Sequence, residues 1–341
     1  MNNLINKFKR NFILFIACMF LLVSCFNIDV TSTEPLFAET TNETSYFESI
    51  ARPATIKKNL LVLSYSNPEN AAEILDWYND QYTLIGYSEK DIEYRTFKLI
   101  DYIRCGSTWH GEKYYNCYGG FALNYSVYDF VYDNGIPPYG DDGTFDYGAV
   151  YEKFDICNLI KEDKIDEIWI WESGNGKASE SVTSRSKDST GNPLSVNMPP
   201  SCGKTVTILN FNYMRSIDLA LHTYGHRIER AMWFHHFDEF GCGYIPSEAE
   251  NGTFTSRPSP ENNYIGTCGD IHRPPNVYTT ADLEYIYDSP AFAVSTCNTW
   301  EPENNGMKEI ISCKDWGCHP GKYYIWWMQH ILPNWWGDLF E

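Results

Sequence analysis

Basic residues are scarce in this chain of 341 residues, which has 26 lysines and arginines against 45 aspartates and glutamates. The formal net charge is −19 at pH 7. Proteins that bind nucleic acid need clustered Lys and Arg to neutralise phosphates and release counterions. The charge balance therefore predicts no nucleic-acid partner. It also indicates a chain that attracts cations and is repelled by anionic membrane surfaces.

Several sequence motifs are absent as well. The chain has no CxxC spacing, which excludes a zinc ribbon or a thioredoxin-type site, and no GxSxG motif of the esterase type. It has no internal repeat of fixed period, which argues against a solenoid or a propeller. Hydrophobic residues make up 43% of the chain, so a disordered or collagen-like protein is excluded.

The N-terminal segment has the pattern of an export signal. Residues 1–10 contain three basic residues and no acidic one, and residues 12–23 form an apolar run that is too short for the ~20 residues of a membrane-spanning helix. The pattern predicts a signal peptide at residues 1–24. The sequence Leu-Val-Ser-Cys that ends at Cys25 resembles a bacterial lipobox, which implies a lipid anchor on that cysteine. Cleavage after Ala38 is the second interpretation.

The rest of the chain divides by composition. Residues 25–58 are rich in Thr, Ser, Glu and Asn and have no apolar period, so we expect a flexible tether. Residues 59–341 are predicted to form a single domain, with a split near residue 150 as the second interpretation.

Cysteine usage agrees with export. Of 11 cysteines, nine remain after Cys18 and Cys25 are set aside with the leader. In an oxidising compartment we expect up to four disulfides and one remaining thiol, with Cys105 and Cys117 as the first candidate pair because a short polar loop separates them. We therefore predict an exported protein, located at the cell surface or on the periplasmic side as a lipoprotein, or otherwise secreted.

The expected fold class is α/β, with a mixed sheet, flanking helices and a loop-rich, disulfide-bearing C-terminal part. Continuous apolar runs predict strands, and apolar residues at helical spacing predict helices. The expected strands are residues 59–66, 165–172 and 205–213, and the expected helices are residues 70–81, 151–162 and 215–235. Residues 93–151 are expected to form strands and long loops, and residues 322–331 a further regular element.

Two histidines one turn apart are the most informative local feature. His222 and His226 lie within the expected helix 215–235, and Glu229 follows at i+7 from His222. These three positions point within roughly 60° of one another on a helix. Two imidazoles at this spacing can bind one Zn²⁺, as in the HExxH motif of zinc hydrolases. Here Thr223 occupies the position of the HExxH general base, so a base must come from elsewhere.

A catalytic zinc site needs a third protein ligand. The candidates are His235, His236, Glu229 and His272. We favour His272 because two prolines stiffen its loop and the nearby Cys268 is available for a disulfide. Glu229 is predicted either to bind the metal or to orient a histidine.

Two carboxylates are candidates for the general base. Glu172 and Glu180 lie at or just beyond the carboxyl end of the expected strand 165–172, where open α/β sheets usually place active-site groups. A different interpretation also fits the motif: His222 and His226 are structural residues that hydrogen-bond where the helix packs on the sheet and bind no metal.

Three motifs together resemble those of a group of secreted bacterial proteins. They are the HxxGHxxE pattern from His222 to Glu229, the CGxxHxPPN pattern from Cys268 to Asn276, and the NWW sequence that begins at Asn334. The resemblance covers roughly residues 150–341 and implies no activity. It directs attention to His222, His226, Glu229 and His272 as one group.

The predicted function is a secreted, surface-tethered, zinc-dependent hydrolase that acts on peptide bonds. The alternative is a carbohydrate-active or carbohydrate-binding surface protein without a catalytic metal, with Glu172 and Glu180 as acid and base. Its sugar-stacking platform would be Tyr323, Tyr324, Trp326, Trp327, Trp335 and Trp336. A non-catalytic adhesin is the third hypothesis. The expected partners are an extracellular peptide or glycan, and a membrane only through a lipid on Cys25.

Overall fold

The computed structural model describes a large part of the chain after residue 53. The described residues are 54–65, 88–104, 108–109, 112–113, 121–133, 135, 137–140, 143–172, 178, 180–183, 199–213, 215–241, 253–256, 265–277, 286–302, 306–331 and 335. All of them belong to the compact unit Ala51–Glu341. The predicted signal peptide, the lipidation site at Cys25, the helix at residues 70–81 and the Cys105–Cys117 pair lie outside the described residues.

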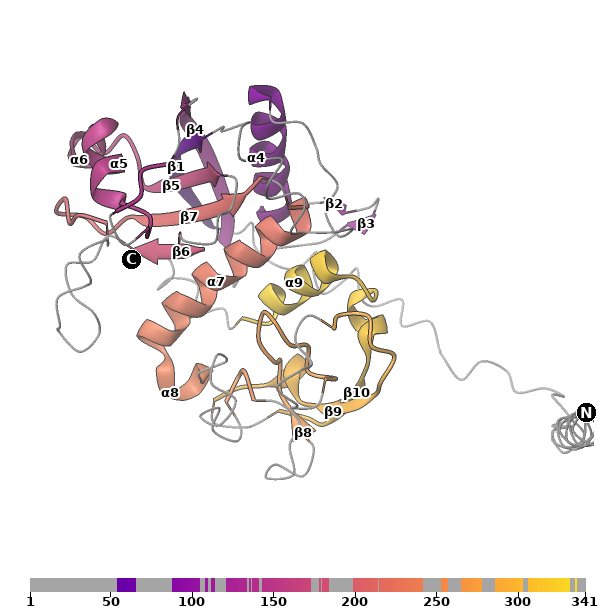
Figure 1. Cartoon of the computed structure of the whole chain (residues 1–341). Helices are drawn as coiled ribbons and strands as arrows, with labels where there is room; N and C mark the ends of the chain where they lie inside the picture. The colour runs from indigo at the N-terminus through magenta and orange to yellow at the C-terminus, as the bar shows by residue number, and fades with distance from the viewer. Residues whose placement is uncertain are drawn as a thin grey trace, which may run out of the picture. The chain divides into compact units, whose positions relative to one another are not determined.

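A five-stranded sheet forms the centre of the fold, in the order β4-β1-β5-β7-β6 (Figure 1). The parallel strands are β1 (Ala54–Tyr65), β4 (Phe121–Asp133), β5 (Glu167–Glu172) and β7 (Thr207–Asn212). The short edge strand β6 (Ser181–Thr183) pairs antiparallel with β7. The predicted α/β class with a mixed sheet is confirmed.

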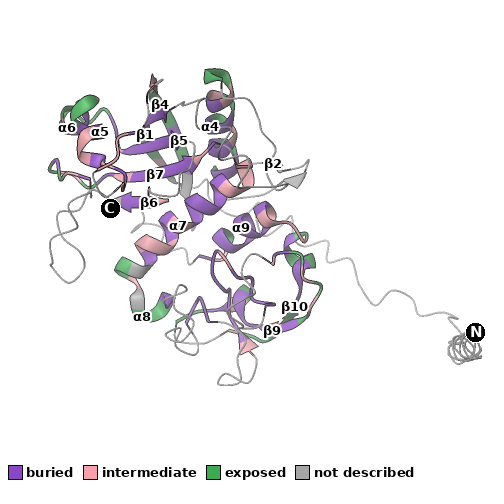
Figure 2. Cartoon of the chain, viewed as in Figure 1, coloured by how far each residue is buried: buried purple, intermediate pink, exposed green. Residues whose placement is uncertain are grey.

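Helices cover both faces of this sheet, which is why its central strands are continuous apolar runs. The helices α4 (Glu89–Ile103) and α7 (Ile217–His235) pack on one face, and the helices α5 (Tyr147–Lys153) and α6 (Ile156–Lys161) pack on the other. Figure 2 shows the buried strands between these helices, with α6 exposing part of its surface.

Alternation along β5 assigns its side chains to the two faces. Trp169 and Trp171 belong to the apolar cluster under α4 and α7, whereas Ile168 and Ile170 belong to the cluster under α5 and α6. Successive residues of a strand point to opposite faces, so Glu172 has the same direction as Ile168 and Ile170. This assignment decides which of the two candidate bases can approach α7.

Helix α4 corrects the prediction of strands and loops for residues 93–151. Ser88 and Asp91 form a capping box at its start, and Ile92, Leu99 and Ile103 are buried at helical spacing. The exposed aromatics Tyr94 and Phe97 interrupt the apolar pattern in the sequence, because exposed aromatic residues are indistinguishable by type from buried ones. The rest of this region includes the 13-residue strand β4, as expected of a strand-rich segment.

One boundary also differs from the predictions, and the second interpretation of the domain division does not apply. Strand β1 begins at Ala54, inside the predicted tether 25–58, because pairing with β4 from Ala54↔Phe121 onward orders a segment that is polar in sequence. No domain boundary occurs near residue 150 within the described part of unit Ala51–Glu341, because strands from both sides of that position share one sheet.

The C-terminal part consists of short elements and connecting segments. They are α8 (Phe237–Phe240), β8 (Ile265–Gly266), β9 (Ala293–Ser295), η2 (Cys297–Thr299), β10 (Glu309–Ile311), η3 (Cys313–Trp316) and α9 (Pro320–Gln329). Elsewhere in the chain, a small hairpin of β2 (Thr108–Trp109) and β3 (Glu112–Lys113) precedes β4. Helix α9 covers most of residues 322–331 and confirms the regular element predicted there.

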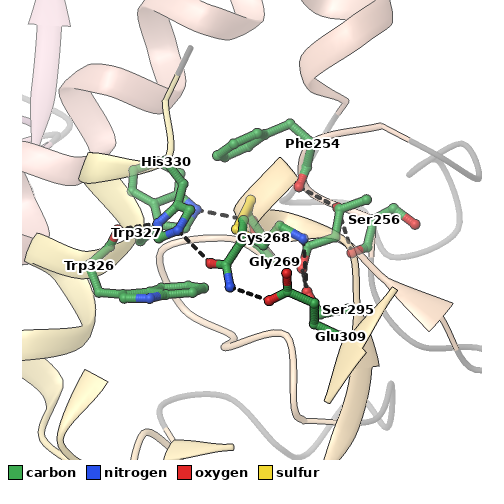
Figure 3. The surroundings of a disulfide bond; sticks show 12 residues. Phe254, Ser256, Cys268, Gly269, Ser295, Glu309, Trp326, Trp327 and His330 are labelled. Atoms are coloured by element: carbon green, nitrogen blue, oxygen red, sulfur yellow. Dashed lines mark hydrogen bonds between the residues drawn. A yellow bond between two sulfur atoms is a disulfide. The ribbon is translucent and has the colours of Figure 1, made fainter. Parts of the chain in front are cut away.

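Three disulfides join cysteines within the described ranges: Cys157–Cys202, Cys268–Cys297 and Cys313–Cys318. Two of them lie in the C-terminal part, as predicted. Figure 3 shows Cys268–Cys297 among the residues that connect α9 to the loops: the Trp327 indole donates to the carbonyl of Gly269 at 3.1 Å, and His330 pairs with Asn298 at 2.9 Å. Disulfides of this kind are typical of proteins in oxidising compartments.

No helix in the described part of the chain combines the length and the apolar character needed to cross a membrane.

The C-terminal aromatic residues form a core. The described members of the predicted sugar platform, Tyr323, Tyr324, Trp326, Trp327 and Trp335, are all buried. Their rings pack against one another and against aromatics such as Phe240, Phe254 and Trp300. A ring buried in this way has no face for a sugar, so the described aromatics do not form the predicted platform.

Candidate metal centre

Helix α7 presents His222 and His226 on one side, as the sequence predicts. Its buried residues Leu221, Tyr224 and Ile228 pack in the apolar cluster against the sheet, which fixes the rotation of the helix. The two imidazoles lie one turn apart with ring centroids 4.5 Å from each other. The histidine pair therefore faces away from the sheet core, toward the loop at residues 268–277.

Gly225, between the two histidines, lets that loop approach the helix closely. A Cβ atom at this position would overlap the side chain of Ile271. Glycine in the interior of a helix costs about 0.5–1 kcal/mol relative to alanine, so a packing reason for its presence is expected. Here the reason is the close contact between α7 and the segment that contains His272.

The loop at residues 268–277 is held by contacts from several elements. The Tyr323 hydroxyl donates to the carbonyl of Asp270 at 2.8 Å, and the Tyr287 hydroxyl donates to the carbonyl of Ile271 at 2.9 Å. Gly269 has a φ of +69°, and a Cβ there would overlap the carbonyl of Arg273, so only glycine fits. Together with the Cys268–Cys297 disulfide, these contacts fix the backbone that positions His272.

Three imidazoles meet where this loop contacts α7. The His272 ring centroid lies 4.9 Å from that of His222 and 4.8 Å from that of His226. One ring nitrogen from each residue lies within 4.8 Å of those of the other two. Two atoms bound to the same zinc at about 2.0–2.1 Å lie at most about 4.2 Å apart, so small rotations of the rings bring all three to one ion. These residues could hold a metal ion.

The other candidates for the third ligand lie elsewhere. His235 and His236 are at the C-terminal end of α7, where the His236 ring stacks on Trp335 with centroids 4.9 Å apart. In the part of the chain that the structure describes, the group of potential metal ligands contains His222, His226 and His272 alone. The preference for His272 over His235 and His236 agrees with this grouping.

Glu180 lies beside the three histidines. Its Oε2 atom is 3.1 Å from His226 Nε2 and 3.5 Å from His222 Nδ1, and its side chain is 32% exposed. Burial by itself raises the pKa of this carboxyl, but the hydrogen bond from His226 and the nearby positive charges outweigh burial and lower the pKa to about 2. Glu180 is therefore an ionised acceptor next to the imidazoles.

Glu229 connects the helix to the His272 loop. Its Oε2 atom is 2.8 Å from His226 Nδ1, and its Oε1 atom accepts a hydrogen bond from the backbone N–H of Ile271 at 3.0 Å. The carboxylate thus orients the His226 ring and the residue before His272 at the same time. This geometry matches the orienting role rather than the ligand role of the two that the sequence allowed. We call His222, His226, His272, Glu180 and Glu229 the histidine cluster.

The two residues of the histidine pair have opposite pKa shifts. Burial lowers the pKa of His222 well below its ordinary value, and the charge of His226 lowers it further. Burial also opposes the charged form of His226, but Glu180 and Glu229 outweigh it and raise the pKa of His226 to about 10. Two carboxylates at opposite nitrogens of one ring account for this rise.

Glu172, the other candidate base, is not brought to the histidine cluster. It is buried on the sheet face covered by α5 and α6, where it accepts a hydrogen bond from the Tyr139 hydroxyl at 3.3 Å. Burial raises its pKa to about 7. The period-two alternation of β5 separates this carboxyl from the imidazoles, so only Glu180 of the two candidates is suitably placed.

Arg215 is a residue of this site that the sequence analysis did not identify. Its Nη1 atom lies 3.3 Å from Glu180 Oε1. It directly precedes Ser216, the N-cap of α7. A cation at a helix N-terminus is unfavourable with respect to the helix dipole, so the position of Arg215 in the sequence was a signal for an anionic partner nearby.

Comparison of the chain with protein-family models, with curated proteins and with solved structures finds no match.

Proposed function

We propose that this protein is a zinc-dependent hydrolase in which His222, His226 and His272 bind the metal. One observation supports this most directly: three imidazoles from two segments distant in sequence converge within 4.8 Å beside an ionised carboxylate. A structural histidine usually satisfies its nitrogens with one or two local partners, whereas convergence of three rings is the donor set that zinc, copper, iron and nickel prefer. Three nitrogen ligands leave the fourth tetrahedral position of zinc for water.

Glu180 is the proposed general base. Its Oε2 atom lies 3.1 Å from His226 Nε2 and 3.5 Å from His222 Nδ1, so the carboxylate is next to any water that the three imidazoles would hold through a metal, and it can accept a proton from that water. The bound metal would supply two effects, a lower pKa of that water and polarisation of the substrate carbonyl. Glu229 orients His226 from the opposite ring nitrogen, a position where carboxylates commonly support histidine ligands of zinc.

The proposed substrate is a peptide or related amide outside the cell. Hydrolysis of an amide needs an activated water and a polarised carbonyl, and the combination of metal and base provides both. Export is supported by the disulfides of the described residues and by the leader-like sequence of residues 1–24. Surface attachment through a lipid on Cys25 is part of the same proposal.

Zinc binding is the first test. We expect the purified protein to bind one zinc ion per chain, measured by elemental analysis after zinc supplementation and dialysis. His222→Ala, His226→Ala and His272→Ala each lower the zinc affinity by more than the ~10–100-fold that loss of an orienting group costs. The matched control is His235→Ala, an exposed histidine on the same helix. A wild-type protein without zinc, or a His272→Ala variant with wild-type affinity, would refute the proposal.

Glu180→Gln separates the role of base from that of ligand. If Glu180 is the base, the variant keeps its zinc and loses about 10²–10⁴-fold in the rate of amide hydrolysis. If the variant instead loses its zinc, Glu180 is a fourth ligand, the site is closed, and the hydrolase proposal is wrong. Both quantities are measured on the same zinc-supplemented preparation with a mixture of synthetic peptides, analysed by mass spectrometry.

A further inference from the structure

The guanidinium of Arg215 stands at the edge of the histidine cluster on a fixed backbone. The carbonyl oxygen of Arg215 accepts a 2.7 Å hydrogen bond from the side chain of Arg95, which is buried in α4. The next residue is the N-cap of α7. The backbone of Arg215 is therefore anchored to two helices. This fixes the position of the Cα atom from which the side chain extends toward Glu180.

Much of the hydrogen-bonding capacity of this guanidinium remains available. Arginine has five N–H donors in a planar fork. The structure gives one side-chain pair, between Nη1 and Glu180 Oε1, and the buried Nε atom has no hydrogen-bond partner among the described residues. The Arg215 side chain is 29% exposed, so solvent and solutes reach part of it. Because Nε is inaccessible, a substrate group would bind the terminal Nη groups, which carry four of the five donors.

Glu180 links the guanidinium to the histidines. Its Oε1 atom faces Arg215, and its Oε2 atom faces His222 and His226. Only the carboxylate of Glu180 therefore separates the Arg215 guanidinium from the imidazoles. In a chain with net charge −19, most of the surface repels anions, so a partly exposed arginine here is a specific attraction for one.

We propose that Arg215 binds a free carboxylate of the substrate, so that the preferred substrate is an amide whose amine half is an amino acid with an ionised α-carboxylate. Carboxylates match the guanidinium fork, which can form two parallel hydrogen bonds to them. This inference rests on the proposed hydrolase function. It adds the substrate class, namely the C-terminal bond of peptides and N-acyl amino acids.

A simpler role for Arg215 would be to orient Glu180. The two roles differ in their kinetic effects. A residue that only orients the base affects kcat equally for all substrates, whereas a residue that binds a substrate carboxylate affects KM, and only for substrates with that group. The comparison therefore needs a pair of substrates that differ in the carboxylate alone.

The experiment uses the full chain after zinc supplementation, with an N-benzoyl dipeptide and the same dipeptide as its C-terminal amide. We expect the wild type to hydrolyse the acid with a kcat/KM about 10–100-fold higher than that of the amide. Arg215→Lys, which keeps the charge but loses the fork, should remove most of this preference by raising KM for the acid. The control Arg104→Lys changes an exposed arginine paired with Asp101 and should keep the preference.

The outcomes separate the two proposals. Equal hydrolysis of acid and amide, or an equal loss for both in Arg215→Lys, overturns the carboxylate inference and leaves the hydrolase intact. If neither peptide is hydrolysed, both are titrated calorimetrically into the same protein. Binding of the acid alone that Arg215→Lys weakens then supports the carboxylate site without the hydrolase. Absence of binding overturns the inference as well.

Discussion

Helix α7 contributes to two polar clusters that differ in their donor groups and in the exposure of most of their members. Toward the sheet, Arg227 and Tyr224 join Glu167, Tyr125 and Trp169 in what we call the buried cluster. Toward the C-terminal loops, its neighbours His222, His226 and Glu229 belong to the histidine cluster. The side chains of Arg227 and Glu167 are 4% and 1% exposed, whereas those of His226 and Glu180 are 22% and 32% exposed.

The buried cluster pairs its charges internally. Glu167 accepts hydrogen bonds from the Trp169 indole at 2.9 Å, from Arg227 Nη2 at 3.0 Å and from the Tyr125 hydroxyl at 3.3 Å. Such a carboxylate has little capacity left for a ligand. The cluster therefore holds α7 against β5 and β4, and it shows that buried charge on this helix does not by itself indicate a binding site.

The histidine cluster instead brings three imidazoles together, and four of its five members are partly exposed, whereas His222 is buried. His226 is paired with Glu180 and Glu229, but the imidazoles do not pair with one another as a carboxylate and a guanidinium do, because protonated rings repel and neutral rings offer lone pairs. Three such rings could hold a metal ion. The comparison teaches that the kind of donors that converge, and not burial or charge alone, distinguishes the candidate site from the structural cluster.

The largest expected effect is on the buried cluster. Glu167→Gln leaves Arg227 as an uncompensated buried charge and should lower the free energy of unfolding by about 3–5 kcal/mol. Urea denaturation measures this loss. The control Asp101→Asn removes an exposed carboxylate paired with Arg104 and should cost less than about 1 kcal/mol. Zinc affinity of the folded Glu167→Gln protein should stay at the wild-type level. A loss as small as that of Asp101→Asn would contradict the structural role.

The next effect concerns Glu172, the candidate base that belongs to neither cluster. Its pKa is raised from 4.5 to about 7 in the folded protein, so the unfolded chain loses this proton first. The stabilisation that Glu172 contributes is therefore complete below pH 4.5 and is lost as the pH rises through about 7, by about 3 kcal/mol. Glu172→Gln keeps an acceptor for Tyr139 and should abolish this decline.

Unfolding in urea between pH 4 and pH 8 tests the Glu172 prediction. The variant should be more stable than the wild type at pH 8 and similar to it at pH 4. The lowered pKa of Glu180 and the raised pKa of His226 also change stability within this window, but they act equally in both proteins, so the difference between wild type and variant isolates Glu172. Parallel pH profiles for the two proteins would show that Glu172 is not held neutral by burial.

The smallest expected effect is at the link between α7 and the His272 loop. Glu229→Gln removes the charge beside His226 Nδ1 while keeping an acceptor for the Ile271 N–H. We expect zinc affinity to fall about 10–100-fold, measured by competition with a chromophoric chelator. The matched control is Glu239→Gln, an exposed carboxyl on α8, which should bind zinc as the wild type does. Unchanged affinity in Glu229→Gln would exclude the orienting role.

The elements that the sequence predicted well are those with a strong local pattern. Strands β5 and β7 and helix α7 agree with the predictions because their apolar runs and helical period are properties of adjacent residues. Helix α4 was missed because its exposed Tyr94 and Phe97 conceal the period. The C-terminal aromatics were a surface platform only in the alternative function, and their burial agrees with core packing, the default role of such residues.

The candidate site also has some features that the sequence determines and others that depend on the tertiary structure. The sequence alone determined that His222, His226 and Glu229 share one face of a helix, because 3.6 residues per turn is a local property of the backbone. Tertiary structure alone decided that His272 joins them, that Glu180 rather than Glu172 lies beside them, and that Arg215 faces Glu180. These neighbours come from separate segments, so their proximity depends on which sheet face α7 covers and on how the loop at residues 268–277 packs against it.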